Sequence, residues 1–295
     1  MKCLFIYNPE SGRGKIKRKE GYITARLKEK YDVVDVKKTE RRGHAKTIAS
    51  DNLGKYDTYV VAGGDGTLNE IVSAIAEKDN APNIGYIPTG TVNDVAHSLG
   101  IKKKVKKALK TILTGKDFCH DVFKCGDHYG LYVCAIGSIS ESSYDTKQTA
   151  KKAFGKLAYF FHGAGKVFKG KSFPVKLEYD GGVVEQDTAL FLAMNSKHVA
   201  GFTVNKYAEL SDGMVDIVMI KNPKERVTLS SLLKIAKLFL FKLKSSEKTK
   251  GLIHLKLKEF TLTTSPDTSI NLDGEFGFKG SFDFKMINDG IRIIV

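Results

Sequence analysis

Short apolar runs alternate with longer amphipathic segments in the first part of the chain. The apolar runs predict buried strands over residues 4–7, 31–36, 58–62 and 84–87. The segments between and after them predict helices over residues 16–30, 44–51, 68–77 and 94–99. Strands separated by helices of this length favour a mostly parallel sheet with helices on both faces.

After about residue 118 the apolar positions alternate with polar ones, and β-branched residues become frequent. This pattern predicts antiparallel strands over residues 122–125, 129–136, 175–179, 188–193, 214–220, 252–257, 259–263, 270–272, 282–287 and 291–295. Helices are expected only over about 147–168 and 226–244. We therefore expect an α/β fold, with a mostly parallel N-terminal α/β domain over residues 1–122 and an antiparallel, β-rich, sandwich-like C-terminal domain over residues 123–295.

Composition excludes several classes of protein. The chain has 295 residues, of which 42% are hydrophobic and 27% charged, as is usual for a globular protein. No apolar run reaches the roughly eighteen residues of a membrane-spanning helix. The four cysteines, Cys3, Cys119, Cys125 and Cys134, form no Cys-x-x-Cys pair, so neither a zinc site nor a disulfide framework is expected. These observations favour a cytoplasmic location.

The net charge of +15 is concentrated in basic stretches, which include residues 102–116 and 226–250. Such surfaces attract anionic lipid, polyphosphate or nucleic acid. Solvated lysine faces without a specific partner explain the charge equally well. No nucleic-acid-binding motif accompanies the charge, so nucleic acid is not an expected partner.

A glycine-rich turn directly follows the apolar run that ends at residue 62. Residues 63–70 read Gly-Gly-Asp-Gly-Thr-Leu-Asn-Glu. Three glycines within four residues let the backbone approach a bulky ligand, and the amides of the following helix attract an anion. Asp65 would repel a phosphate there unless a cation or a transferable proton lies between them. The turn therefore predicts phosphate chemistry with a metal ion.

Two more turns of this kind follow other predicted strands, at residues 8–12 and 88–94. Because ligands of parallel α/β sheets bind beyond the carboxyl ends of the strands, we expect the three loops to converge on one crevice. The usual nucleotide motifs are absent: residues 11–15 match only part of a P-loop, and neither Gly-x-Gly-x-x-Gly nor the protein-kinase set is present.

Five motifs occur in order along the chain. They are Asn8-Pro9-x-Ser11-Gly12, the turn at 63–70, Pro88-x-Gly90-Thr91-x-Asn93-Asp94, the Asp-Gly segment at 211–216 and Asn271-Leu272-Asp273-Gly274-Glu275. In this order they resemble the diacylglycerol kinase catalytic-domain family, in particular its soluble bacterial lipid kinases. That family is similar to NAD kinases and phosphofructokinases through the Gly-Gly-Asp-Gly turn. The resemblance spans nearly the whole chain and implies that the first domain binds ATP with Mg²⁺.

The resemblance also implies the nucleotide contacts. They are Asn8, Ser11, Gly12, Thr39, Gly63, Gly64, Asp65, Gly66, Thr67, Leu68, Asn69 and Thr91. Glycine amides would cradle the phosphates, and the side chains of Thr67 and Asn69 would add hydrogen bonds. Asp65 would interact with magnesium or its waters, since hard cations prefer carboxylate oxygen.

The late Asp-Gly-Glu motif supplies the candidate catalytic carboxylates. By resemblance Glu275 is the base that accepts the proton of the acceptor hydroxyl. Asp273 beside it would bind a metal ion or orient the reacting groups. Asp65 is a rival for the role of base. Asp212 is implied as a structural magnesium ligand, with main-chain carbonyls near Glu209 and Met214. Asp-Gly is also a common hairpin signal, so plain turns stay open at 212 and 273.

The function that the resemblance implies is transfer of the γ-phosphoryl group of ATP to a lipid hydroxyl, with diacylglycerol as leading acceptor and phosphatidic acid as product. Alternatives are a kinase of NAD, a sphingoid base or another lipid alcohol, and a non-catalytic basic protein that binds membrane or nucleic acid. Residues 195–201, where Ser196 departs from the family pattern, are expected to shape the acceptor pocket.

Residues 226–244 predict a packed helix, and a helix lying at an anionic lipid surface is the second interpretation. The expected partners are thus ATP and a lipid at the inner face of a membrane, and a homodimer is left open.

Overall fold

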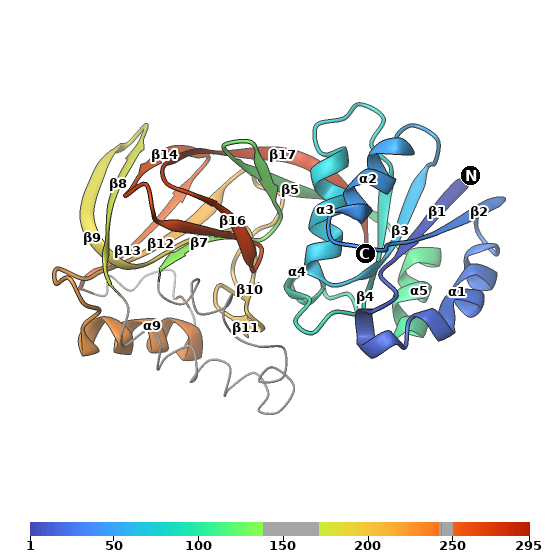
Figure 1. Cartoon of the computed structure of the whole chain (residues 1–295), viewed down its shortest axis with the longest axis horizontal. Helices are drawn as coiled ribbons and strands as arrows, with labels where there is room; N and C mark the ends of the chain where they lie inside the picture. Colours follow the sequence, from blue (N-terminus) through green and yellow to red (C-terminus); the bar gives the residue numbers. More distant parts are fainter. Residues whose placement is uncertain (138–170, 242, 244–249) are drawn as a thin grey trace.

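The computed structural model describes residues 1–137, 171–241, 243 and 250–295, so the helix predicted over about 147–168 lies outside the described residues. Two lobes lie side by side (Figure 1). The first contains the N-terminal strands and their helices, and the second contains most of the remaining strands.

The first lobe is built on four parallel strands in the order β4-β3-β1-β2. The bounds are β1 Lys2–Tyr7, β2 Val33–Lys38, β3 Thr58–Gly63 and β4 Asn83–Pro88. The helices are α1 Glu20–Leu27, α2 His44–Asp51, α3 Asp65–Ile75, α4 Asp94–Ser98 and α5 Val105–Thr114, with the 3₁₀ turns η1 Ser11–Gly14 and η2 Lys17–Lys19. Buried side chains of α2 and α3 share one core with Tyr59 and Val61 of β3, whereas those of α1 and α5 share another with Val60 of β3. Helices therefore cover both faces of this sheet, as predicted.

The second lobe is antiparallel. Its elements are β5 Asp117–Cys125, β6 His128–Gly130, β7 Val133–Gly137, β8 Phe173–Tyr179, β9 Gly182–Met194, β10 His198–Val199, β11 Phe202–Thr203, β12 Val215–Lys221, α9 Leu229–Phe241, β13 Leu252–Leu257, β14 Glu259–Thr263, β15 Ser269–Leu272, β16 Glu275–Lys279 and β17 Phe282–Ile294. The main path of pairing runs β16-β15-β7-β9-β8-β14-β17. Phenylalanines fill its core, with the rings of Phe260 and Phe284 stacked at 4.6 Å. The predicted combination of a parallel first part and an antiparallel second part is confirmed.

Two strands connect the lobes. β5 runs through residue 122, where the sequence places the domain boundary, and pairs with β17 from Cys125↔Phe284 to Asp117↔Ile294. The end of β17 also pairs with β4 of the first lobe, at Ile293↔Ile84. The last residues of the chain therefore belong to the sheet of the first lobe.

Some elements differ from the sequence expectation for clear physical reasons. The helix predicted over 16–30 is only α1 preceded by η2, and just before it Gly12, Arg13 and Gly14 adopt positive φ values of 59°, 59° and 71°. The strand predicted over 129–136 is interrupted at Leu131 and Tyr132. The amides of these two residues donate to the carboxylate of Asp273 instead of to the carbonyls of a neighbouring strand. None of the helices within the described ranges is long and apolar enough to cross a bilayer.

Candidate active site

Three loops meet at the carboxyl ends of β1, β3 and β4. The hydroxyl of Ser11 lies 2.8 Å from that of Thr89, and the Thr89 amide donates to the carbonyl of Gly63 at 2.8 Å. Gly64 and Gly90 touch backbone to backbone, because a β-carbon on Gly90 would lie 2.5 Å from the Gly64 Cα. Only glycine permits so close an approach.

Helix α3 begins immediately behind the second loop. Leu68 donates its amide to Gly64 at 3.2 Å and closes the first turn, so the amides of Asp65, Gly66 and Thr67 have no acceptor within the helix. Amides at this place attract an anion. The side chain of Leu68 is fully buried, so only its backbone is left to contact a ligand.

Asp65 is directed inward. Its side chain accepts hydrogen bonds from the amides of Asp94 at 3.1 Å and Val95 at 3.3 Å, at the start of α4. Burial raises the pKa of Asp65, against the opposing effect of these amides. The backbone amides of Asn93 and of Asp65 itself also act on this carboxylate. The role of Asp65 toward a magnesium ion stays a prediction.

Asp94, whose amide donates to Asp65, also contacts the second lobe. Its fully buried carboxylate accepts a 2.8 Å hydrogen bond from the amide of Gly201. Nearby, the hydroxyls of Ser98 and Ser196 lie 2.8 Å apart. Residues 195–201, which the sequence assigns to the acceptor pocket, therefore face α4 directly.

Asp273 is saturated with hydrogen bonds. Its carboxylate accepts from the amides of Leu131, Tyr132 and Val133 at 2.7–3.0 Å and from the side-chain amide of Asn69 at 2.7 Å. Burial outweighs these four donors and raises the pKa of Asp273 to about 6. Asp273 and Asn69 consequently join the lobes and have little capacity left for a substrate.

Glu275, two residues later, is placed differently. Asp273 and Gly274 have positive φ values of 51° and 84° and turn the chain into β16. The Glu275 side chain is 50% exposed, and its Oε2 pairs with Nη2 of Arg42 at 2.5 Å. Its Oε1 lies 2.6 Å from the point that a β-carbon on Gly66 would occupy. Of the two carboxylates in this motif, Glu275 alone stands open beside the start of α3.

The remaining predicted contacts lie at the same edge of the sheet. Asn8 donates its amide to Ala62 at 3.0 Å, and Thr39 donates its amide to Tyr7 at 2.9 Å. Gly12, with a φ of 59°, lies against the carbonyl of Thr89. Thr91 is exposed, and its carbonyl accepts from Lys103.

The segment around Asp212 lies elsewhere, between β11 and β12. Asp212 forms an ion pair with Lys256 and accepts from the amide of Met214 at 3.0 Å, while Glu209 is exposed. In the part of the chain that the structure describes, no three His, Cys, Asp or Glu side chains are grouped to hold a metal ion. A cation at Asp212 would therefore need main-chain carbonyls and water, and that site stays a prediction.

No role was predicted from the sequence for Arg42 or for Glu70. Glu70, inside the glycine motif, accepts from the amides of Gly43 at 2.8 Å and Ala45 at 3.0 Å and so fixes the start of α2. The pair of arginines at 41 and 42 was the only signal in the sequence for Arg42.

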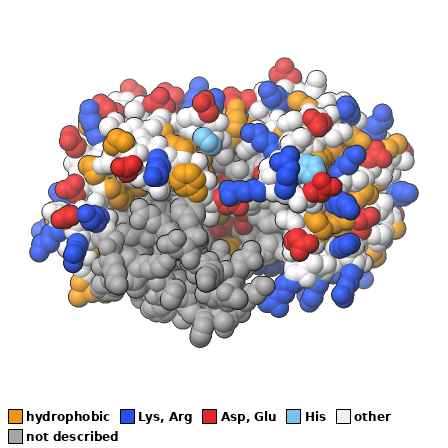
Figure 2. Space-filling model, viewed as in Figure 1, with side chains coloured by type: hydrophobic (Ala, Val, Ile, Leu, Met, Phe, Trp, Pro, Cys, Tyr) orange, Lys and Arg blue, Asp and Glu red, His pale blue; other side chains and the backbone are white. Residues whose placement is uncertain are grey.

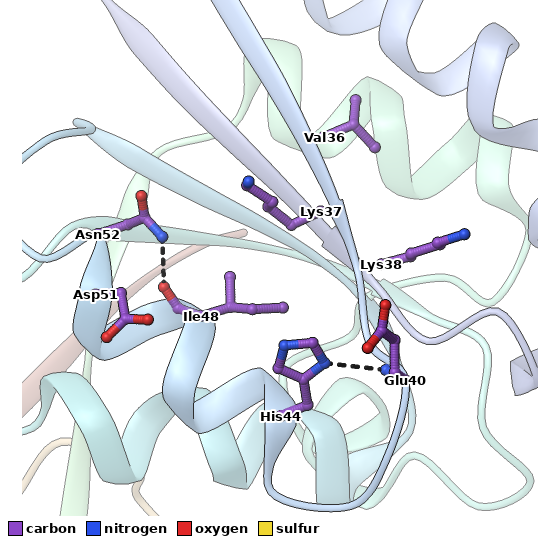
Figure 3. Close-up of a pocket in the computed structure, with 8 residues that line it drawn as sticks. All are labelled: Val36, Lys37, Lys38, Glu40, His44, Ile48, Asp51 and Asn52. Carbon is purple, nitrogen blue, oxygen red and sulfur yellow. Dashed lines mark hydrogen bonds between the residues drawn. The ribbon is translucent and has the colours of Figure 1, made fainter.

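A depression of about 430 Å³ lies between β2 and α2 (Figure 3). Its lining residues are Val36, Lys37, Lys38, Glu40, His44, Ile48, Asp51 and Asn52. Among these lining residues, His44 accepts a 3.1 Å hydrogen bond from the Glu40 amide. No lining residue belongs to the glycine loops. A separate hollow between the lobes, in which acidic side chains are visible, appears in Figure 2.

Comparisons with known proteins identify relatives of this chain. A sequence model of the family described as "Diacylglycerol kinase catalytic domain" matches residues 2–125. A Staphylococcus saprophyticus protein named diacylglycerol kinase is 32% identical over 296 residues, covering 99% of this chain and 94% of that protein. A Staphylococcus aureus protein of the same name is 33% identical over 282 residues, covering 94% and 87%. A solved structure from Bacillus anthracis, assigned as a diacylglycerol kinase, has a TM-score of 0.87 at 26% identity and covers 99% of this chain and 96% of that chain.

Proposed function

Because this chain belongs to the diacylglycerol kinase family of lipid phosphotransferases, we propose that it transfers the γ-phosphoryl group of ATP to a lipid hydroxyl. Diacylglycerol is the proposed acceptor and phosphatidic acid the product. The observation that carries the proposal is the place of Glu275, whose open carboxylate lies against Gly66 where the three loops meet.

The chain's own groups would act mainly by positioning and charge neutralisation, which dominate phosphoryl transfer. Amides of Gly66 and Thr67 and the hydroxyls of Ser11 and Thr89, which lie 2.8 Å apart, would hold the phosphates. Magnesium, when bound, would neutralise phosphate charge, with Asp65 accepting hydrogen bonds from its waters.

Glu275 would then serve as the general base. It takes the proton of the acceptor hydroxyl as the acceptor oxygen forms its bond to the γ-phosphorus. The bond between that phosphorus and the bridging oxygen breaks, and ADP leaves with the bonding electrons. Asp273 is a poorer candidate for the base because four donors already occupy its carboxylate. Asp65 is poorer because it is 9% exposed and faces α4.

The lipid acceptor calls for contact with a membrane surface, and α9 offers one. Its inner face packs on the second lobe through the side chains of Leu232, Ile235, Leu238 and Phe239. Its outer face exposes 62% of Leu229 and 63% of Leu233, one turn apart, with Lys237 one turn further. Apolar side chains beside lysines suit the interface of an anionic bilayer. We place the enzyme at the inner, cytoplasmic face, where ATP is supplied and its four free cysteines stay reduced.

An acceptor screen tests this function. The purified chain is incubated with γ-labelled ATP and magnesium together with diacylglycerol, with mixed bacterial lipids, with a sphingoid base, with NAD or with no acceptor. Label in phosphatidic acid is the expected result. Label in NAD or in a sphingoid phosphate would replace the proposed acceptor, and no labelled product with any acceptor would remove the kinase assignment.

A further inference from the structure

Arg42 stands in the loop between β2 and α2, and this loop is tied to α3. Gly43, the next residue, donates its amide to Glu70 of α3 at 2.8 Å, and Ala45 donates to the other oxygen of the same carboxylate at 3.0 Å. Two hydrogen bonds to one charged group hold the loop firmly. The backbone of Arg42 is therefore fixed one helical turn beyond Gly66.

The guanidinium of Arg42 reaches from the first lobe to the second. Its Nη2 lies 2.5 Å from Oε2 of Glu275, and Oε1 of that carboxylate lies over Gly66. The guanidinium is thus separated by a single carboxylate from the first-turn amides of α3. These are the amides to which we assign the phosphates.

The pair is exposed, which makes it easy to exchange. The Arg42 side chain is 74% exposed and that of Glu275 is 50% exposed. Solvated ion pairs of this kind contribute little to stability. A guanidinium also matches phosphate oxygens in the same two-pronged manner as it matches a carboxylate.

We propose that Arg42 is a nucleotide-binding residue with two alternative partners, Glu275 and the terminal phosphate of ATP. Binding of ATP moves the guanidinium from the carboxylate to the phosphate oxygens. The same movement releases Glu275 to accept a proton, so the base becomes available only when the phosphoryl donor is present. This inference rests on the proposed function of the α3 amides and of Glu275.

Binding measurements by calorimetry test the exchange, with magnesium and either a non-hydrolysable ATP analogue or ADP. Arg42→Ala should weaken the analogue by about tenfold or more, as expected for a lost charge-assisted hydrogen bond, and should weaken ADP much less. Arg42→Lys, which keeps the charge, should fall between. Arg41→Ala removes the same charge from the same loop and should change either affinity by less than about twofold.

Variants of Glu275 distinguish two explanations: exchange of Arg42 between Glu275 and phosphate, and simple repulsion between Glu275 and phosphate. Glu275→Gln should tighten the analogue about two- to fivefold, because Arg42 no longer has to leave a partner. This gain should vanish in the double variant with Arg42→Ala. If the gain persists there, it arises from repulsion between Glu275 and phosphate, and the exchange is refuted.

The outcomes also separate this inference from the function on which it rests. No binding of the ATP analogue by the unaltered chain would overturn both. Normal binding with Arg42→Ala indistinguishable from Arg41→Ala would overturn the role of Arg42 alone. Thermal unfolding of each variant provides the folding control, and we expect no shift for Arg42→Ala because its side chain is exposed.

Discussion

Asn69 donates a 2.7 Å hydrogen bond from its side-chain amide to Oδ2 of Asp273, which stands 204 positions further along the chain. Asn69 belongs to the glycine motif of the first lobe, and Asp273 belongs to the Asp-Gly-Glu motif of the second. The backbone amides of residues 131–133 complete the shell around the same carboxylate. Two sequence motifs that resemble catalytic elements are therefore joined by a contact that fixes how the lobes meet.

Removal of the Asp273 carboxylate should destabilise the whole protein. Asp273→Ala leaves three buried amides without their acceptor and removes one of the two acceptors of the Asn69 side-chain amide, and we expect a loss of about 3 to 5 kcal/mol in the free energy of unfolding. Urea denaturation measures the loss. Asp267→Ala, in an exposed turn of the second lobe, is the control and should change stability by less than about 0.5 kcal/mol. Equal effects of the two variants would contradict the anchoring role.

The same residue predicts a pH dependence. Its pKa in the folded chain is about 6, above the usual value of an unfolded aspartate. The part of its contribution to stability that depends on proton binding is therefore full below about pH 4 and is lost as the pH rises through 6. Relative to Asp273→Asn, the unaltered protein should lose about 2 to 3 kcal/mol between those pH values. Urea titrations at several pH values measure this difference. A difference that instead grows with pH would mean that the four donors dominate over burial.

The close approach of two loops predicts a strong effect at one glycine. Gly90→Ala would place a β-carbon 2.5 Å from the Gly64 Cα, so the loops must separate, and both stability and affinity for Mg-ATP should fall. Gly21→Ala lies in α1 with open space around the new carbon and should stabilise the fold by up to about 1 kcal/mol. Calorimetric titration with Mg-ATP and urea denaturation check the pair. Unchanged nucleotide affinity in Gly90→Ala would separate these loops from the nucleotide site.

Glu275 should be required for turnover and not for folding. Glu275→Gln removes the proposed base from a half-exposed side chain, so kcat should fall by about 10²- to 10⁴-fold while the unfolding transition stays unchanged. Steady-state rates with diacylglycerol in mixed micelles measure this. Glu259→Gln, exposed on β14, serves as the matched control. Near-full activity of Glu275→Gln would return the role of base to Asp65.

Membrane contact through α9 can be tested on its two exposed leucines. The double variant Leu229→Ser/Leu233→Ser should bind anionic vesicles about tenfold more weakly, because two apolar side chains no longer enter the interface. Sedimentation with vesicles at low and high salt measures binding, which should weaken as salt rises. Val183→Ser changes an equally exposed apolar residue on β9 and should have no effect. If the unaltered chain does not bind anionic vesicles at low salt, α9 does not contact the membrane.

Local patterns in the sequence predicted many of the elements. The bounds of α2, β13 and β14 agree with the prediction residue for residue. In these segments the spacing of apolar and polar residues is enough to predict the element, without knowledge of distant contacts. Helix α5 was missed because its lysines suggested a charged stretch, although Val105, Ala108, Leu109 and Ile112 form a buried face at helical spacing. Strand β16 was missed because the Asp273–Gly274 turn and Gly277 obscure its alternation.

The site was predictable only in part, because its chemistry depends on distant partners. The glycine spacing indicated where three loops would end. Nothing local distinguishes Asp273 from Glu275, and only the amides of residues 131–133 make one a structural anchor and leave the other open. The proposed role of Arg42 likewise depends on its ion pair with Glu275, which lies more than two hundred positions further along the chain.

The course of β17 has a consequence for how this protein is made. The sheet of the first lobe receives its final strand from residues near 293, and Lys116 and Val295 exchange two backbone hydrogen bonds of 3.0 and 2.9 Å. On the ribosome, the amino-terminal half must therefore wait with an unpaired edge at β4 until the carboxyl-terminal segment has been synthesised. Fragments that stop at residue 122 would retain that exposed edge and should aggregate. A peptide that contains the end of β17, added in trans, could pair with β4 and cover this edge.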